Sequence, residues 1–231
     1  ITQNVGTDIN ADYLVGGNKQ FGKFSVDVSF GGNTLRSQFL SMNQNSSNFT
    51  VANLYTINNG TIKNQGNPFF VRSRVNSLYG MAELGYNGLV YLNFTGRNDW
   101  FSVLNPEHNS KFYPSVSGSF IFSELIKNLK WLSYGKLRAS WAQVGSISGV
   151  GPFEGVLTYG INQNQFNGQT LGSINGTNAP NPLLQPFTVT EKEIGLELRL
   201  FKNRLLLDVA AFDKLTTEQI VEVPLSNTSG Y

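Results

Sequence analysis

The sequence has no cysteine, a single histidine and few charged residues. Of its 231 residues, 14% are Asp, Glu, Lys or Arg, whereas soluble domains usually carry about 25% charge. The absence of cysteine excludes disulfides, thiol catalysis and cysteine-based metal sites. His108 lies beside Glu107 in an expected loop, with no second histidine to share a metal ion. We therefore expect neither a metal nor a cofactor.

Sequence motifs for catalysis are also missing. There is no nucleophile elbow, no metalloprotease helix motif and no phosphate-binding loop. Glu191, Glu193 and Glu197 are spaced as one polar face of a strand, which is a simpler explanation than paired catalytic carboxylates. We expect no catalytic residue and no enzyme. The net charge of +2, with no run of Lys or Arg, argues against nucleic acid as a partner.

No apolar run approaches the roughly 18 residues that a transmembrane helix requires. A membrane barrel instead crosses with strands that alternate between a lipid-facing and a lumen-facing side chain, which leaves no long apolar run. The 24 glycines and the aromatic content of 13% suit such strands. No signal peptide is visible at the start, so we expect a processed chain or an internal piece of a longer one.

The stretch Asn76–Asp99 carries the clearest structural signal. It predicts two antiparallel strands joined by a tight turn at Asn87-Gly88. Side chains alternate between the two faces of a strand. In the second strand the face with Leu92 and Phe94 is apolar and the opposite face is strongly polar. This combination is typical of a strand with lipid on one side and water on the other.

Eight strands are expected in all. They span residues 7–15, 21–31, 76–86, 89–99, 112–122, 136–145, 189–200 and 205–216. The connections alternate between short ones, including a turn at 16–19 and a helical turn at 124–129, and long outer loops at 32–72, 100–111 and 146–186. Antiparallel order therefore places all short connections at one rim, as in outer-membrane barrels. The predicted fold is all-β: part of an antiparallel, up-and-down transmembrane β-barrel, with about eight strands of a larger plugged barrel.

Short motifs follow one another in order from the central hairpin onward. They are Tyr79-Gly80, Arg97-x-Asp99, Phe112-Tyr113-Pro114-Ser115, Leu137-Arg138-Ala139-Ser140-Trp141, Asn181-Pro182, Ile194-Gly195-Leu196 and Phe212-Asp213-Lys214. This ordered set resembles the SusC/RagA-type TonB-dependent transporters of Bacteroidetes outer membranes. The resemblance is clear from about residue 76 to the end and weak before it.

The resemblance implies a location in the cell outer membrane and a role in nutrient uptake. It implies import of glycan oligomers or peptides with a SusD-like surface lipoprotein as partner. It also implies energy from TonB, delivered through a region absent from this chain, and a plug domain that is likewise not in it. Two alternatives remain at this point: a structural subunit of a larger outer-membrane complex, and a small complete barrel or soluble carbohydrate-binding β-sandwich, whose polar face would be solvated.

Two groups of residues are candidates for function. The first group would face the lumen of the barrel and contact water, a plug or a solute. Its members are Glu83, Tyr91, Asn93, Arg97, Asp99, Arg138, Glu193, Glu197 and Arg199. The candidates for substrate or partner contact in the outer loops are Trp100, Phe101, Tyr159, Asn162, Asn164 and Phe166. Charged groups on a strand face also pair with one another, and loop aromatics also anchor at membrane interfaces, so either group has a purely structural explanation as well.

Overall fold

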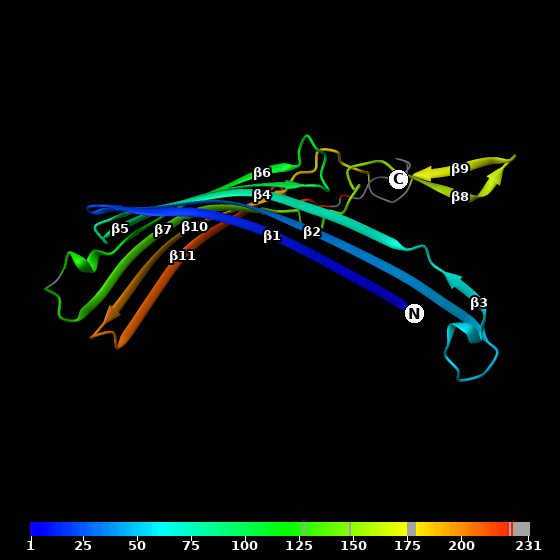
Figure 1. The fold of residues 1–231 in the computed structure, drawn as a ribbon, viewed down its shortest axis with the longest axis horizontal. Coiled ribbons are helices and arrows are strands. Elements are labelled where there is room, and N and C mark those ends of the chain that lie inside the picture. The colour runs from blue at the N-terminus through cyan, green and yellow to red at the C-terminus, as the bar shows by residue number, and fades with distance from the viewer. Residues whose placement is uncertain (127, 148, 175–178, 222, 224–231) are drawn as a thin grey trace.

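A computed structural model describes residues 1–126, 128–147, 149–174, 179–221 and 223, and these form one long, curved antiparallel sheet with a separate hairpin (Figure 1). The strands are β1 (Thr2–Phe21), β2 (Phe24–Phe49), β3 (Gly60–Gln65), β4 (Phe69–Tyr86), β5 (Val90–Phe101), β6 (Ser110–Phe120), β7 (Leu132–Ser146), β8 (Tyr159–Phe166), β9 (Gln169–Ile174), β10 (Phe187–Leu200) and β11 (Leu205–Thr217). The main sheet has the order β1-β2-β4-β5-β6-β7-β10-β11, with β3 paired to β2, and β8 pairs only with β9. Each strand of the main path pairs with the next one in it, as the up-and-down prediction requires.

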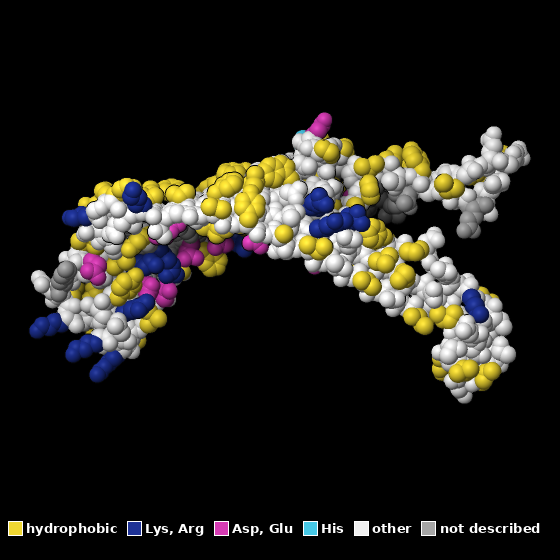
Figure 2. Space-filling view, viewed as in Figure 1, with side chains coloured by type: hydrophobic (Ala, Val, Ile, Leu, Met, Phe, Trp, Pro, Cys, Tyr) yellow, Lys and Arg dark blue, Asp and Glu magenta, His cyan; other side chains and the backbone are white. Residues whose placement is uncertain are grey.

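The main sheet is a single layer whose apolar face is uncovered by any other described element. Leu78, Leu84, Phe94 and Ile194 are each more than 40% exposed on that face. Figure 2 shows apolar side chains along the convex upper side of the arch and acidic side chains along its underside. A soluble β-sandwich would bury the apolar face against a second sheet, so that alternative is wrong.

The first hairpin differs from the prediction. The expected turn at Gly16–Lys19 is strand, and the chain turns instead at residues 22–23, where Gly22 has a φ of +60°. Gly16 serves a different purpose, since the Ser29 side chain occupies the space that a Cβ on Gly16 would fill. The central turn was predicted correctly: Asn87 and Gly88 both have positive φ values, of 52° and 69°.

The expected outer loop at 32–72 is wrong for most of its length. β2 continues to Phe49 and β4 already begins at Phe69, with β3 and a 3₁₀ turn, η1 (Ile57–Asn59), between them. As a result β1, β2 and β4 have 20, 26 and 18 residues, whereas about 9–11 residues cross a membrane. Figure 1 shows these strands projecting well beyond the end of β5.

The other strand boundaries shift by a few residues. The prediction that all short connections lie at one rim and all long ones at the other holds only in part. Residues 22–23, 87–89, 121–131 and 201–204 connect strands at one rim, and 50–68, 102–109 and 147–186 at the other. The connection at 102–109 is shorter than the one at 121–131, so the rims differ less than expected. The helical turn is η2 (Phe122–Glu124) rather than 124–129, of which residue 127 lies outside the described residues.

Helices in the described part of the chain are limited to such short turns. None of them has the length and apolar character needed to cross a membrane.

A polar border crosses the convex face obliquely. On β2 and β4 the opposed pair Thr34 and Asn76 marks it, and on β10 and β11 the opposed pair Lys192 and Asp213. Followed through the register, the second pair lies six residues nearer to the 22–23 rim than the first. That is about 20 Å along the strands over five strand spacings, or about 24 Å, across them, a slope of about 40°. Outer-membrane strands are tilted by about 35–45°, so this slope fits an apolar belt that lies level in a membrane.

Candidate functional site

All nine lumen-wall candidates lie on one face of the sheet. Residues that are directly opposite in neighbouring strands share a face, and the register links Glu83 to Asn93, Tyr91 through Ser119 to Arg138, and Arg138 through Gly195 to the alternate residues of β10. This face is the concave underside of the arch (Figure 2). These side chains share the face opposite the apolar one, while their contact with a plug or solute stays a prediction.

Near the outer end of this face, Arg97 is held by three neighbours. Its Nε donates to Asp99 Oδ1 at 2.7 Å, its Nη2 donates to Ser77 Oγ at 2.8 Å, and its guanidinium lies 5.8 Å from the centre of the Tyr79 ring. Ser77 and Asp99 are both buried, and so is Tyr113 on the next strand. Burial makes these the most firmly positioned polar groups of the concave face.

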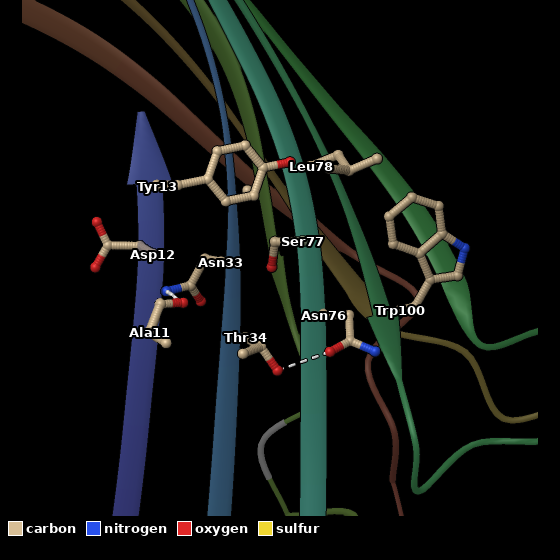
Figure 3. A pocket seen from close by; sticks show the side chains of 10 residues that line it. Ala11, Asp12, Tyr13, Asn33, Thr34, Asn76, Ser77, Leu78 and Trp100 are labelled. Carbon is tan, nitrogen blue, oxygen red and sulfur yellow. Dashed lines mark hydrogen bonds between the residues drawn. The ribbon is translucent and has the colours of Figure 1, made fainter. Parts of the chain in front are cut away.

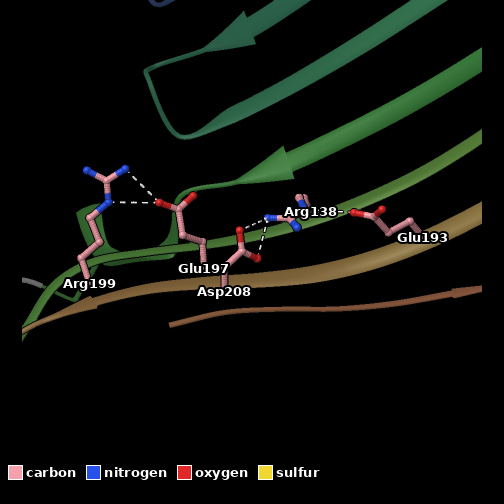
Figure 4. A network of polar contacts seen from close by, with 5 residues as sticks. All are labelled: Arg138, Glu193, Glu197, Arg199 and Asp208. Carbon is pink, nitrogen blue, oxygen red and sulfur yellow. Dashed lines mark hydrogen bonds and ion pairs between the residues drawn. The ribbon is translucent and has the colours of Figure 1, made fainter. Parts of the chain in front are cut away.

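A second group joins three strands through one guanidinium (Figure 4). Arg138 on β7 donates from Nε to Glu193 on β10 at 3.1 Å and lies 3.0 Å from Asp208 on β11. Between them is Gly195, whose added Cβ would lie 2.6 Å from Arg138 Nε. The absence of a side chain at 195 lets the arginine lie across β10 and reach the strand beyond it.

Farther toward the 201–204 turn, Arg199 is paired with its own strand. Its Nε and Nη2 both donate to Glu197 Oε1, at 3.0 and 2.9 Å, and its guanidinium lies 5.0 Å from the centre of the Tyr134 ring. The Glu197 carboxylate is 15% exposed and the Arg199 side chain 50%. On this part of the concave face the Arg199 guanidinium is therefore accessible to water, whereas the Glu197 carboxylate is largely buried.

Glu83 is in a different situation. It lies directly opposite Asp27 on β2 and Asn93 on β5, and neither carboxylate forms an ion pair with any described residue. Like charges directly opposite one another repel. The concave face thus has a negative region on β2 and β4 and a charge-paired region on β7, β10 and β11.

The outer-loop candidates Trp100 and Phe101 are not in a loop. Both belong to β5, which runs two residues farther than expected, so strand alternation sends them to opposite faces. Phe101 is 5% exposed and is, with Leu104 and Tyr113, one of the few buried apolar side chains of the described residues, whereas Trp100 is 37% exposed on the convex side. Phe101 is therefore unavailable to a substrate, and the prediction for it is wrong.

The remaining outer-loop candidates lie on one projecting hairpin. Tyr159, Asn162, Asn164 and Phe166 all belong to β8, which pairs with β9 and stands away from the main sheet (Figure 1). Tyr159 and Phe166 are each 66% exposed. Their exposure suits contact with a solute or partner, which remains a prediction.

A cavity at the outer rim escaped the sequence analysis. It has a volume of about 920 Å³ and is lined by residues 69–72, 102–106 and 151–156, including Phe69, Phe70 and Phe153 among apolar groups and Arg72 and Glu154 among charged ones. These segments are far apart in the sequence, and no local pattern brings them together. The cavity lies at the rim that carries the long connections.

The segment after β11 is fastened back across the sheet. The Glu218 carboxylate accepts hydrogen bonds from Lys111 Nζ at 2.7 Å and from Thr188 Oγ1 at 3.2 Å. The hydrogen bond and charge of Lys111 hold the pKa of Glu218 below its usual value, with Thr188 adding to the effect. This clasp joins the end of β11 to β6, three strands away in the sheet.

No group of three or more His, Asp or Glu side chains within the described residues is arranged to hold a metal ion.

Comparison with known proteins gives consistent results. A family model described as TonB dependent receptor-like, beta-barrel matches residues 2–231. Among sequence relatives, TonB-dependent receptors P26 and P3 of Formosa agariphila are 27% identical over 165 residues and 24% identical over 243. Those alignments cover 68% and 99% of this chain but only 16% and 23% of the receptors.

Solved structures match the whole chain in fold. The RagAB peptide transporter has a TM-score of 0.84 at 22% identity, and the match covers 100% of this chain and 26% of that one. The RagAB peptide importer in its "open-open" state has a TM-score of 0.83 at 21% identity. At these identities the likeness is one of fold, and the chain spans about a quarter of those structures.

Proposed function

The chain belongs to the family of TonB dependent receptor-like β-barrels of the outer membrane, and from that premise we propose that it is wall of a SusC/RagA-type nutrient importer. Proteins of this family are transporters and not enzymes, which agrees with the sequence analysis. The proposed cargo is a glycan oligomer or a peptide. The proposed partners are a SusD-like surface lipoprotein and TonB.

One observation carries the proposal: the sheet has an uncovered apolar face opposite a charged concave face, and its apolar belt ends at a border inclined by about 40° to the strands' perpendicular. The convex side chains are exposed although apolar, as on the lipid-facing side of an outer-membrane barrel. The concave side offers Arg97, Arg138 and Arg199 with their carboxylate partners to enclosed water. A wall with these two surfaces suits a hydrated passage through a membrane.

The concave face supports a role for the wall in holding a plug. Arg97 and Arg138 are fixed by carboxylates and a hydroxyl that belong to the wall itself, so their positions do not depend on a cargo. Asp27 and Glu83 lack such partners among the described residues. We therefore propose that positively charged side chains of the plug pair with Asp27 and Glu83.

At the outer rim, the 920 Å³ cavity and the β8–β9 hairpin are the proposed contact sites for cargo or lipoprotein. Aromatic rings next to charged groups accept both sugar rings and apolar peptide side chains. RagAB, which shares the fold, is a peptide transporter, and peptides therefore belong in the first uptake test of this chain.

The test is deletion of the gene that encodes the full-length protein, followed by uptake of two fluorescent cargo sets, oligosaccharides and peptides. We expect uptake of one set to fall to the background level and to return when the wild-type gene is restored. Depleting TonB should reduce the same uptake to the same level. If the deletion leaves uptake of both sets unchanged but alters the assembly of other outer-membrane proteins, the protein is a structural subunit and the proposal is wrong.

A further inference from the structure

Three arginines cluster on the convex face, just beyond the polar border. Arg36 on β2 lies directly opposite Arg74 on β4, and Arg72 is two residues farther along β4 on the same face. Arg36 and Arg74 are each two residues beyond Thr34 and Asn76, the pair that marks the border, or about 7 Å along the strands. Figure 2 shows dark-blue side chains in the middle of the molecule, between the apolar surface and the projecting strands. Because this level lies just past the apolar belt, we expect lipid headgroups to meet the protein here.

These arginines have no carboxylate within the described wall. β1, β2 and β4 carry four carboxylates, and the register places all of them on the concave face: Asp8, Asp12, Asp27 and Glu83. None of the three arginines forms an ion pair with a described residue. Directly opposed like charges are destabilising, so an anion bound from outside the sheet would stabilise the Arg36–Arg74 pair.

A second reason to expect a bound anion is the burial of part of the Arg36 guanidinium. The Arg36 Nε atom is buried and has no hydrogen-bond partner in the described structure. A buried donor without an acceptor costs free energy comparable to its desolvation. Arginine presents its donors in a planar fork that matches phosphate oxygens, and phosphate is the anion found in lipid headgroups.

An apolar groove runs along the same face, on the membrane side of the cluster (Figure 3). It has a volume of about 450 Å³, its lining includes Tyr13, Leu78 and Trp100, and Thr34 donates a hydrogen bond to Asn76 Oδ1 at 2.8 Å at its edge. Gly32 lets the Tyr13 ring that lines the groove lie over β2, since a Cβ there would lie 2.7 Å from that ring. The groove thus continues from the arginines into the lipid-facing belt.

We propose that this surface binds one phosphorylated lipid of the outer leaflet. The headgroup phosphate lies between Arg36 and Arg74, and an acyl chain occupies the groove between Tyr13 and Trp100. The site is on the face opposite the concave one, so its occupancy does not depend on any cargo. It rests on the membrane location of the chain and not on the proposed transport.

The test uses the full-length protein, extracted in a neutral detergent and freed of lipid. Native mass spectrometry measures the binding of added bisphosphorylated lipid A and of the same lipid after removal of its phosphates. The variant Arg36→Gln/Arg74→Gln removes two charge-assisted contacts, so we expect about a tenfold loss of affinity for the phosphorylated lipid. The control Lys202→Gln/Arg204→Gln removes two cations at the opposite rim and should bind as the wild type does.

Two further measurements make the outcome specific. The dephosphorylated lipid should bind the wild type as weakly as the phosphorylated lipid binds the double variant, and Arg36→Lys/Arg74→Lys should retain most of the affinity. The single Gln variants carry the same test if the double variant does not fold. Equal affinity of the wild type for both lipids, or of the wild type and Arg36→Gln/Arg74→Gln for the phosphorylated one, overturns the proposal. Displacement of the lipid by equimolar inorganic phosphate overturns it as well.

Discussion

Arg138 reaches Asp208 two strands away because Gly195, the residue directly opposite it on the strand between, has no side chain. The guanidinium lies across β10 in the space that a Cβ at 195 would enter. One glycine therefore permits a single side chain to connect β7, β10 and β11 on the concave face. The connection depends on an absence of atoms at 195 as much as on the charges at its ends.

Replacing this glycine tests the relationship. Gly195→Ala should push Arg138 away from Glu193 and Asp208 and lower the unfolding temperature of the barrel, measured by the heat-dependent shift of the folded band on a gel. Gly80→Ala is the matched control, because the nearest atoms to its added Cβ are 3.7 and 3.9 Å away, which is an ordinary contact. In an Arg138→Gln background the Gly195→Ala change should have little further effect; an undiminished effect would contradict the explanation.

Lipid contact on the convex face predicts a strong asymmetry between adjacent residues of β5. Phe94 is 43% exposed on the apolar face, midway between the apolar Val90 and the polar Asn98. Phe94→Arg should therefore cost about 2–4 kcal/mol of folding free energy, the usual cost of Arg near the bilayer midplane. Thr95→Arg, on the concave face, should cost much less. The folding free energies are measured by denaturant titration of the protein in lipid bilayers. Equal losses for Phe94→Arg and Thr95→Arg would contradict the assignment of the faces.

Phe101 and Trp100 should differ in the same way, for a different reason. Phe101→Ala opens a cavity at a buried position and should cost about 3–5 kcal/mol. Trp100→Ala removes a side chain that is 37% exposed at the membrane border and should cost less. The comparison needs only unfolding free energies of the two variants, and a larger cost for Trp100→Ala would show that the two rings are placed the other way round.

The Glu218 clasp should open in acid. The pKa of Glu218 is lowered in the folded state, so its contribution to stability is present above the unfolded pKa, near 4.5, and is lost as the pH falls through the folded value. A spin label at Gln219 should therefore be immobile at pH 7 and gain mobility below about pH 4.5. Glu218→Gln should make it mobile at both pH values. Glu107→Gln, in the 102–109 connection, should leave the wild-type response unchanged.

The β8 residues are expected to affect transport without affecting folding. Tyr159→Ala and Phe166→Ala remove exposed rings from the projecting hairpin, and we expect each to raise the KM for uptake severalfold with the same amount of folded protein. Ile161→Ala, which alters an exposed aliphatic side chain of the same strand, is the control. Unchanged KM values for both aromatic variants would remove this hairpin from the candidate sites.

The alternation of side chains predicted the part of the fold that touches lipid. Leu84, Leu92 and Phe94 alternate with polar residues because lipid and water lie on opposite sides, and the two faces were assigned correctly from that pattern. Beyond the border both faces of β2 and β4 meet water, and residues 32–49 accordingly lack any apolar alternation. The pattern that reveals a strand disappears where the lipid ends, so that region was predicted as a loop.

The sites that were missed depend on pairing across strands. Arg36, Arg72 and Arg74 form no run in the sequence and become a cluster only because β2 and β4 align Arg36 with Arg74. Phe101 was assigned to a loop because the second strand of the central hairpin was expected to end at Asp99, whereas β5 continues to Phe101. Gly16-Gly17 suggested a turn, but Gly16 serves the close approach of Ser29 instead of a positive φ.

The unequal strand lengths described above give the outer rim a mechanical character. β1 and β2 form an unbroken ladder from Phe21–Phe24 to Thr2–Asn43 without a bulge, and β2 continues past the border from Thr34 to Phe49, about 50 Å along its axis. We expect such a continuously paired sheet to be stiff, with one end held in the bilayer and the other end projecting from it. A force on the projecting end should therefore move the membrane-embedded strands, whereas a flexible loop would deform without transmitting that force.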